Sequence, residues 1–198
     1  MEDYGYLFNN EIIDSTREIK GRISKIKNKK TNRLLARKQN LREIWQGIEK
    51  DNSYHIISSD SFGSIELLNV IKEDFKKFDK LNISTWSYND EFVKIIEECN
   101  KDNTELFLCT DKSMRGRKPH LYAQMATLNE KYSNMTFKVH KMIHSKITLI
   151  KIKEYYITIE ASANYSNNQR VENFTITENK ELFIFHKDWM NEIINQNG

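Results

Sequence analysis

The chain has 198 residues, of which 38% are hydrophobic and 30% are charged, and its formal net charge is +3. This length allows one or two domains with a sizeable hydrophobic core. No run approaches the roughly 18 consecutive apolar residues of a membrane span, and the N-terminus lacks an apolar signal region, so we expect a cytoplasmic protein. Two cysteines, Cys99 and Cys109, are too few for a disulfide framework or a four-cysteine zinc site.

The positive charge is concentrated near the N-terminus. Residues 17–42 contain eleven Lys and Arg residues and a single acidic residue, Glu18, so the rest of the chain carries a net negative charge. An asymmetry of this kind indicates an anionic partner.

Two apolar stripes at helical spacing run through the same part of the chain. Isoleucines recur from Ile12 to Ile26, and after a polar break a second stripe runs from Leu34 to Ile48. We therefore predict that residues 1–50 form a basic helical extension. It either packs on the main domain as a solvated hairpin, grips a nucleic acid or contacts an assembly partner.

From residue 51 to residue 198 the pattern changes to strands that alternate with helices. Strand patterns lie at 54–58, 82–86, 104–110, 136–142, 145–152, 155–161 and 172–177. Amphipathic helix patterns lie at 65–77, 90–101, 120–132 and 180–195. Strand–helix alternation favours parallel strands, and the short turns between the later strands favour antiparallel ones. We therefore predict an α/β domain with a mixed β-sheet flanked by helices.

Five polar side chains follow one another along the later strands. His144 and Lys146 are two residues apart, so on a strand they point to one face, and Ser162 and Asn164 do so by the same argument. A hairpin between the two strands that follow His144 brings Asn164 back toward the histidine, and Glu172 opens the next strand. We expect these five groups to converge at one edge of the sheet.

The ordered set resembles the signature of the phospholipase D superfamily, which is His-x-Lys, a downstream Asn usually preceded by Gly-Ser-x, and then Glu or Gln. The resemblance covers roughly residues 53–195 and is strongest between 140 and 178. It also resembles the short members with a single motif that bacteria and their phages encode. It implies a half-unit of that fold and cleavage of a phosphodiester with no metal and no cofactor.

The resemblance also implies a role for each matching residue. His144 attacks phosphorus and forms a phosphohistidine intermediate, while Lys146 and Asn164 hold the non-bridging oxygens. Ser162 supports the phosphate pocket, and Glu172 accepts a hydrogen bond from a histidine and fixes its tautomer. A second histidine must protonate the leaving group. With one motif per chain, this implies a two-fold homodimer.

Two positions depart from the common form of the signature. Lys151 stands where Asp is usual, and this Asp is also missing from the tyrosyl-DNA phosphodiesterase branch. Ala161 replaces the usual Gly and adds a methyl group near the phosphate pocket. A second interpretation therefore stays open. In it, the chain is a catalytically degenerate member that serves as a nucleic-acid-binding protein or as a virion or assembly component.

Basic residues in two segments are the candidates for gripping a nucleic-acid backbone, whether DNA or RNA. The second segment is the loop 112–118, whose alternative interpretation is an exposed loop without a partner. The candidates are Lys27, Lys29, Lys30, Arg33, Arg37, Lys38, Lys112, Arg115, Arg117 and Lys118. Of the other histidines, His140 is expected to shape the cleft and His55 to lie in the core.

Overall fold

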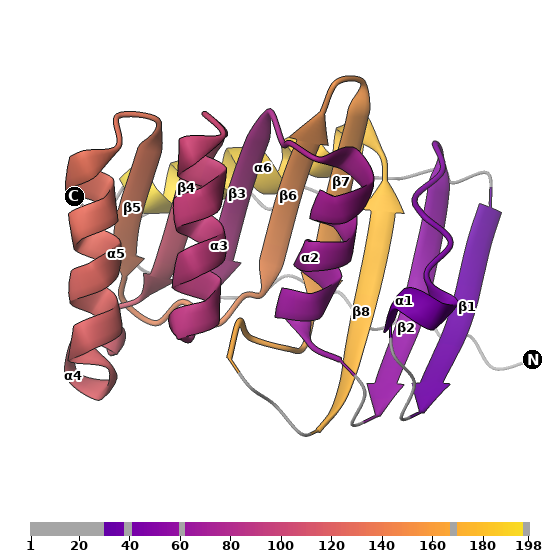
Figure 1. Ribbon diagram of the computed structural model, residues 1–198, viewed down its shortest axis with the longest axis horizontal. Coiled ribbons are helices and arrows are strands. Elements are labelled where there is room, and N and C mark those ends of the chain that lie inside the picture. The colour runs from indigo at the N-terminus through magenta and orange to yellow at the C-terminus, as the bar shows by residue number, and fades with distance from the viewer. Residues whose placement is uncertain (1–29, 38–40, 60–61, 167–169, 196–198) are drawn as a thin grey trace, which may run out of the picture.

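A computed structural model describes residues 30–37, 41–59, 62–166 and 170–195. They form one eight-stranded mixed sheet in the order β1-β2-β8-β7-β6-β3-β4-β5 (Figure 1). The strands are β1 (Lys30–Arg37), β2 (Asn52–Ser59), β3 (Lys80–Thr85), β4 (Glu105–Asp111), β5 (Met135–His140), β6 (Ile147–Ile152), β7 (Tyr155–Ala161) and β8 (Val171–Glu178).

Helices lie on both faces of this sheet. Figure 1 shows three helices in front of the strands, α2 (Ser64–Phe75), α3 (Asp90–Lys101) and α5 (Pro119–Lys131), and α6 (Lys180–Asn195) behind them. Two single-turn helices, α1 (Leu41–Ile44) and α4 (Met114–Arg117), complete the described part. The predicted α/β fold, a mixed sheet flanked by helices, is confirmed. None of the described helices is long and apolar enough to cross a membrane.

The strand directions determine where the loops meet. β3, β4 and β5 are parallel, as strands joined by helical crossovers should be. β6, β7 and β8 are antiparallel to their neighbours, and β6 pairs with β3. As a result, β3, β4 and β7 end at the edge of the sheet where β6 and β8 begin. We call this edge, at the bottom of Figure 1, the site edge.

Apolar side chains fill the space on both faces of the sheet. The main core lies between the sheet and α2, α3 and α5, and it includes the fully buried Leu81, Ile83 and Ile150. Full burial of a side chain of this size stabilises the fold by about 1.5–3 kcal/mol. A smaller core under α6 contains Cys109 and Phe183.

Both cysteines behave as small buried hydrophobes. Burial raises the pKa of Cys99 to about 11 and that of Cys109 to about 12, so both thiols stay protonated at neutral pH. A protonated, buried thiol is a poor nucleophile.

The N-terminal part of the described chain corrects one prediction. Lys30–Arg37 is a strand, not part of a helix, and it pairs in parallel with β2 from Lys30 opposite Asn52 to Arg37 opposite Ser59. Without β1, the outer edge of β2 would expose unpaired backbone N–H and C=O groups, and β1 forms hydrogen bonds with them. This tertiary pairing outweighs the local helical spacing. The helix predicted from Ile12 to Ile26 lies outside the described residues, so the extension over residues 1–29 stays a prediction.

Candidate active site at the sheet edge

His144 and Lys146 lie side by side at the site edge. The strand predicted at 145–152 begins at Ile147 in the structure, so both residues precede β6. The Nζ atom of Lys146 lies 3.0 Å from Nδ1 of His144 and donates a hydrogen bond to the His144 carbonyl oxygen at 2.7 Å. Ser145 points the other way, to a hydrogen bond with Ser84 of β3. The alternation expected from the two-residue spacing therefore holds just before the strand.

Ser162 and Glu172 form a second pair at the same edge. Backbone pairing of β7 with β8 continues into Ser162, whose N–H donates to the Asn173 carbonyl oxygen at 3.1 Å. The Ser162 hydroxyl donates to the Glu172 carboxylate and accepts from the Asn173 N–H at 3.0 Å. Glu172 is only 7% exposed, so the structure holds a buried carboxylate with a neighbouring hydroxyl.

Electrostatics link the two pairs. Burial lowers the pKa of Lys146, and the negative charge of Glu172 raises it by less, so the pKa stays below the ordinary value of 10.5. The backbone adds a direct link, because the Ala161 N–H donates to the Lys146 carbonyl oxygen at 3.0 Å. The Lys146 ammonium therefore contacts the imidazole of His144 and is electrostatically coupled to the carboxylate of Glu172.

Asn164 joins the group through β3. Its side-chain oxygen accepts from the Thr85 hydroxyl at 3.4 Å, a long hydrogen bond, and Thr85 is the last residue of β3. The next residue along, Trp86, lies with its ring centroid 6.0 Å from that of His144. Asn164 and His144 therefore both lie next to the short segment at the end of β3.

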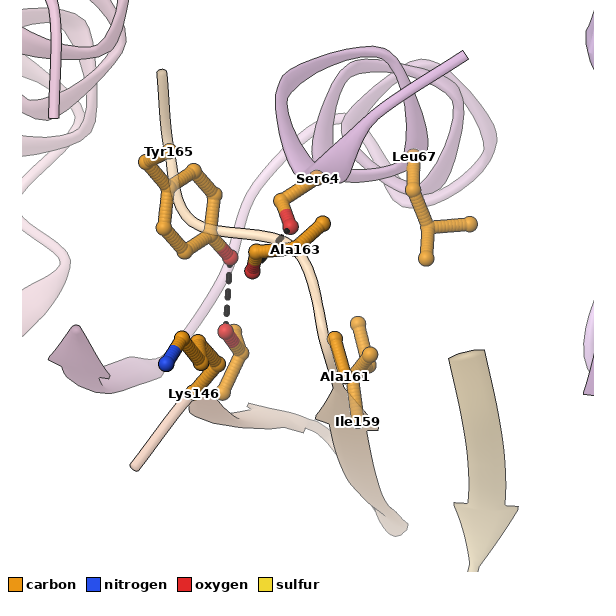
Figure 2. A pocket seen from close by; sticks show the side chains of 8 residues that line it. Ser64, Leu67, Lys146, Ile159, Ala161, Ala163 and Tyr165 are labelled. Carbon is orange, nitrogen blue, oxygen red and sulfur yellow. Dashed lines mark hydrogen bonds between the residues drawn. The ribbon is translucent and has the colours of Figure 1, made fainter. Parts of the chain in front are cut away.

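The loop after β7 is anchored at two points, which Figure 2 shows. The Ser64 hydroxyl, in the first turn of α2, donates to the Ala163 carbonyl oxygen at 3.1 Å. The Tyr165 and Thr148 hydroxyl oxygens are 2.6 Å apart and buried. These anchors hold Ser162 and Asn164 in place from both sides.

Ala161, one of the two departures from the signature, lies beneath this loop. Together with Lys146 and Leu67 it lines a small cavity of about 10 Å³ (Figure 2). That volume is about the size needed for one water molecule. In register Ala161 lies opposite Phe174, a buried residue of the main core, so its methyl group is on the α2 face of the sheet.

Lys151, the other departure, lies away from the site. Its Nζ donates to the Lys153 carbonyl oxygen at 2.8 Å and is 3.7 Å from a carboxylate oxygen of Asp79. It lies four positions beyond Ile147 along β6, which is roughly 13 Å at the usual rise of a strand. The missing Asp at this position therefore affects the far turn of the hairpin and not the surroundings of His144.

The other histidines play different parts. His140 ends β5 opposite Asp111, three strands from β6 at the site edge. His186 of α6 is buried, accepts a hydrogen bond from Trp189 Nε1 at 2.8 Å and lies 3.3 Å from a carboxylate oxygen of Glu160. His55 is exposed, so its expected place in the core is wrong. Among the described side chains, no group of three or more His, Cys, Asp and Glu is placed to share a metal ion.

The basic candidates divide into three sets. Lys27, Lys29 and Lys38 lie outside the described residues, and the second set is on β1, where Lys30 is opposite Asn52, Arg33 opposite His55 and Arg37 opposite Ser59. The third set follows β4: Lys112 is exposed, Arg115 lies over the Tyr122 ring, Arg117 lies over the Trp86 ring, and Lys118 donates to the Tyr88 carbonyl oxygen.

The sheet order places the second and third sets on opposite sides of His144. β1 is four strands from β6, roughly 19 Å at the usual strand spacing, and β4 is two strands away in the other direction. Sequence reasoning missed Trp86, which no motif contains. Its only signal was its place at the end of the strand predicted at 82–86, which in the structure ends one residue earlier, at Thr85.

Comparisons with known proteins match the fold and not the sequence. No family model matches the chain, and no curated protein matches it. Nuc from Salmonella typhimurium, a phospholipase D family member, has a TM-score of 0.56 at 11% identity, over 73% of this chain and 95% of Nuc. NucT from Helicobacter pylori has a TM-score of 0.53 at 15% identity, over 72% of this chain and 96% of NucT. TrmBL2, an archaeal chromatin protein that binds DNA, has a TM-score of 0.52 at 8% identity, over 77% of this chain and 56% of TrmBL2.

Proposed function

Because the chain has the phospholipase D-like fold, we propose that it is a metal-independent phosphodiesterase that cleaves nucleic acid through His144. The observation that supports this best is the contact of Lys146 with His144 at the site edge. The Ser162–Glu172 pair lies beside it and is coupled to the same ammonium. A nucleophile and a cation for the phosphate oxygens are thus within reach of one substrate atom.

In the first proposed step, a ring nitrogen of His144 attacks phosphorus. A P–N bond forms while the P–O bond to the leaving nucleoside breaks. Lys146 and Asn164 donate to the non-bridging oxygens and stabilise the charge that grows on them. Lys146 can do so by exchanging its hydrogen bond to the His144 carbonyl oxygen for one to the phosphate.

In the second proposed step, water attacks phosphorus and the P–N bond breaks, which restores His144. A second histidine has to protonate the leaving oxygen and then accept a proton from the water. Each chain carries one His-x-Lys motif. We therefore propose a two-fold homodimer in which the two copies of His144 meet across an isologous interface. Light scattering at micromolar concentration should give the mass of a dimer, and a monomer that still turns over would contradict this proposal.

Nucleic acid is the proposed substrate because basic residues lie on both sides of His144. Arg37 ends β1, and Arg117 follows β4, at the same edge of the sheet. A nucleic-acid strand that runs along this edge would pass basic residues before and after the scissile bond. Replacing Arg37 and Arg117 with Gln should flatten the dependence of log K on log salt, since each phosphate contact contributes about −0.9 to this slope for duplex DNA.

A second function has one specific observation in its favour, which is Ala161 at the position of the usual Gly. Its methyl group borders the cavity beside Lys146 and reduces the room there. If the methyl group prevents the substrate phosphate from binding there, the chain has no turnover and is a nucleic-acid-binding or virion assembly protein of the same fold. The similarity to TrmBL2, which binds DNA, agrees with this alternative.

One experiment separates the two functions. Pure protein is incubated with labelled DNA and RNA, with and without EDTA, beside His144→Ala and the matched control His140→Ala. We expect cleavage that persists in EDTA, is lost in His144→Ala and is kept in His140→Ala. Cleavage that EDTA abolishes and Mg²⁺ restores would contradict the mechanism. Binding without any cleavage would favour the second function.

A further inference from the structure

Arg117 is held in a fixed position next to the site. Its Nε atom donates to the Ser113 hydroxyl at 3.0 Å, and one Nη2 hydrogen bond reaches the Trp86 carbonyl oxygen at 3.3 Å. Its guanidinium carbon lies 3.8 Å from the centroid of the Trp86 ring, which is the geometry of a cation–π contact. Three contacts therefore fix the orientation of a side chain that is exposed.

Ser113, which accepts the hydrogen bond from Arg117, is itself held by Asp111. The Asp111 carboxylate accepts hydrogen bonds from both the backbone N–H and the hydroxyl of Ser113. Asp111 is buried at the end of β4. Burial alone would raise the pKa of Asp111, but the Ser113 hydrogen bonds and the charge of Arg117 lower it below its ordinary value. The carboxylate therefore stays charged and holds Ser113 in place for Arg117.

Trp86 connects this arrangement to His144. Its ring lies against the guanidinium on one side and 6.0 Å from the imidazole centroid, within the usual range for paired aromatic rings. The guanidinium is therefore within about 10 Å of the imidazole. This is of the order of the distance between the scissile phosphate and a neighbouring phosphate of the same strand.

We propose that Arg117, supported by Trp86 and Ser113, is the binding site for the phosphate next to the scissile one. The two hydrogen bonds use two of the five N–H donors of a guanidinium, so the rest of the planar group can bind phosphate oxygens. The proposal rests on the proposed function and narrows its substrate class. The substrate is a strand with at least two consecutive phosphates, and not an isolated diester.

A binding experiment tests this without relying on turnover. Thymidine dinucleotides with a phosphate at the 5′ end, at the 3′ end or at neither end are titrated into His144→Ala protein, with binding followed by NMR. We expect one end-phosphorylated dinucleotide to bind about tenfold more tightly than the unphosphorylated one, as for a charged hydrogen bond. Adding Arg117→Gln should remove this preference.

The matched control is Arg115→Gln, which removes the same charge from the same turn of helix. Arg115 lies over Tyr122, with its guanidinium carbon 5.0 Å from the ring centroid, and not over Trp86. This variant should weaken all three ligands similarly and keep the preference. The proposal is overturned if the preference for an end-phosphorylated dinucleotide is as large with Arg117→Gln as without it. It is also overturned if the protein that retains Arg117 shows no such preference. If wild-type protein cleaves nothing but the preference depends on Arg117, the phosphate site stands and the proposed function fails.

Discussion

The Nζ atom of Lys146 lies 3.0 Å from Nδ1 of His144 and donates to the carbonyl oxygen of the same residue at 2.7 Å. The ammonium is thus placed at the nucleophile before any substrate arrives. In this position it can meet a phosphate oxygen as soon as phosphorus comes within reach of the imidazole. This preorganisation is the geometric basis of the proposed reaction.

The first prediction concerns pH. Because the pKa of Lys146 is lowered in the folded protein, the ammonium loses its proton at a lower pH than an exposed lysine does. The ratio kcat/KM should therefore fall on the alkaline side at a pH below 10.5. Lys146→Arg stays charged at every accessible pH, so its alkaline limb should disappear even if its rate is lower. A wild-type profile that stays flat through pH 10.5 would show that this proton plays no part.

The charge of Glu172 gives a second prediction, because it raises the pKa of Lys146 against the effect of burial. Glu172→Gln removes that charge and should lower the pKa of Lys146 further. The titration of the Lys146 Nζ group can be followed by NMR in both proteins, which needs no activity. An unchanged or raised pKa in the variant would mean that the two groups are not coupled.

Ser162 should contribute to stability through the buried carboxylate of Glu172. Ser162→Ala removes a hydroxyl donor from a charged group that is only 7% exposed. The free energy of unfolding should fall by about 1–3 kcal/mol, and urea denaturation measures it. Ser162→Thr keeps the hydroxyl and serves as the control. Equal loss in both variants would assign the effect to packing and not to the hydrogen bond.

The fourth prediction concerns Glu160 and His186, which pair on the face of the sheet that α6 covers. We expect this pair to contribute to the free energy of unfolding at neutral pH and to lose that contribution in acid. The nearby imidazole of His186 lowers the pKa of Glu160 below 4.5, although burial opposes this. A carboxyl group whose pKa is lowered by folding stabilises the fold fully at pH values above its ordinary pKa. This contribution is lost as the pH falls through the pKa of the folded state. The Glu160 side chain is 44% exposed, so screening limits the effect to at most about 1 kcal/mol.

The measurement for Glu160 is the free energy of unfolding between pH 7 and pH 3. Glu160→Gln should be less stable than wild type at pH 7, and the difference should shrink toward pH 3. Glu130→Gln, at an exposed position of α5, is the control and should show neither effect. A difference that is constant over this range would contradict the assignment to Glu160.

Ala161→Gly tests whether the methyl group at this position blocks the site. Because the methyl group is on the α2 face and lines the small cavity, its removal should cost about 0.5–1 kcal/mol of stability. We expect kcat/KM to stay within about twofold of wild type. An increase of tenfold or more would show that the methyl group crowds the phosphate, and would favour the non-catalytic interpretation of the natural chain.

Much of this arrangement follows from local sequence, and the rest depends on contacts that no local pattern encodes. The helix over 90–101 and the strand over 155–161 were predicted with the bounds that the structure gives. The two-residue spacing of His144 and Lys146 was enough to predict that both side chains lie on the same side of the chain, opposite Ser145. By contrast, β1 forms because the edge of β2 is open to it, and helical spacing of leucines does not reveal that.

Trp86 and Arg117 illustrate the same limit at the site. They are 31 residues apart, and their contact depends on β3 and β4 ending at one edge with the α4 turn folded back over it. The sequence supplied Arg117 as one of several basic residues in a loop. Only the fold distinguishes it from Arg115, which lies over a different ring.

The most direct test of the account is to trap the covalent intermediate on His144. Protein and a short labelled oligonucleotide are mixed in EDTA, quenched at alkaline pH to preserve the acid-labile P–N bond, and examined by intact-mass spectrometry and peptide mapping. The account predicts a transient adduct with the mass of one cleavage product on the peptide that contains His144, and no adduct in His144→Ala. Cleavage by wild-type protein with no adduct on His144 at any time point, together with full activity of His144→Ala, would contradict it.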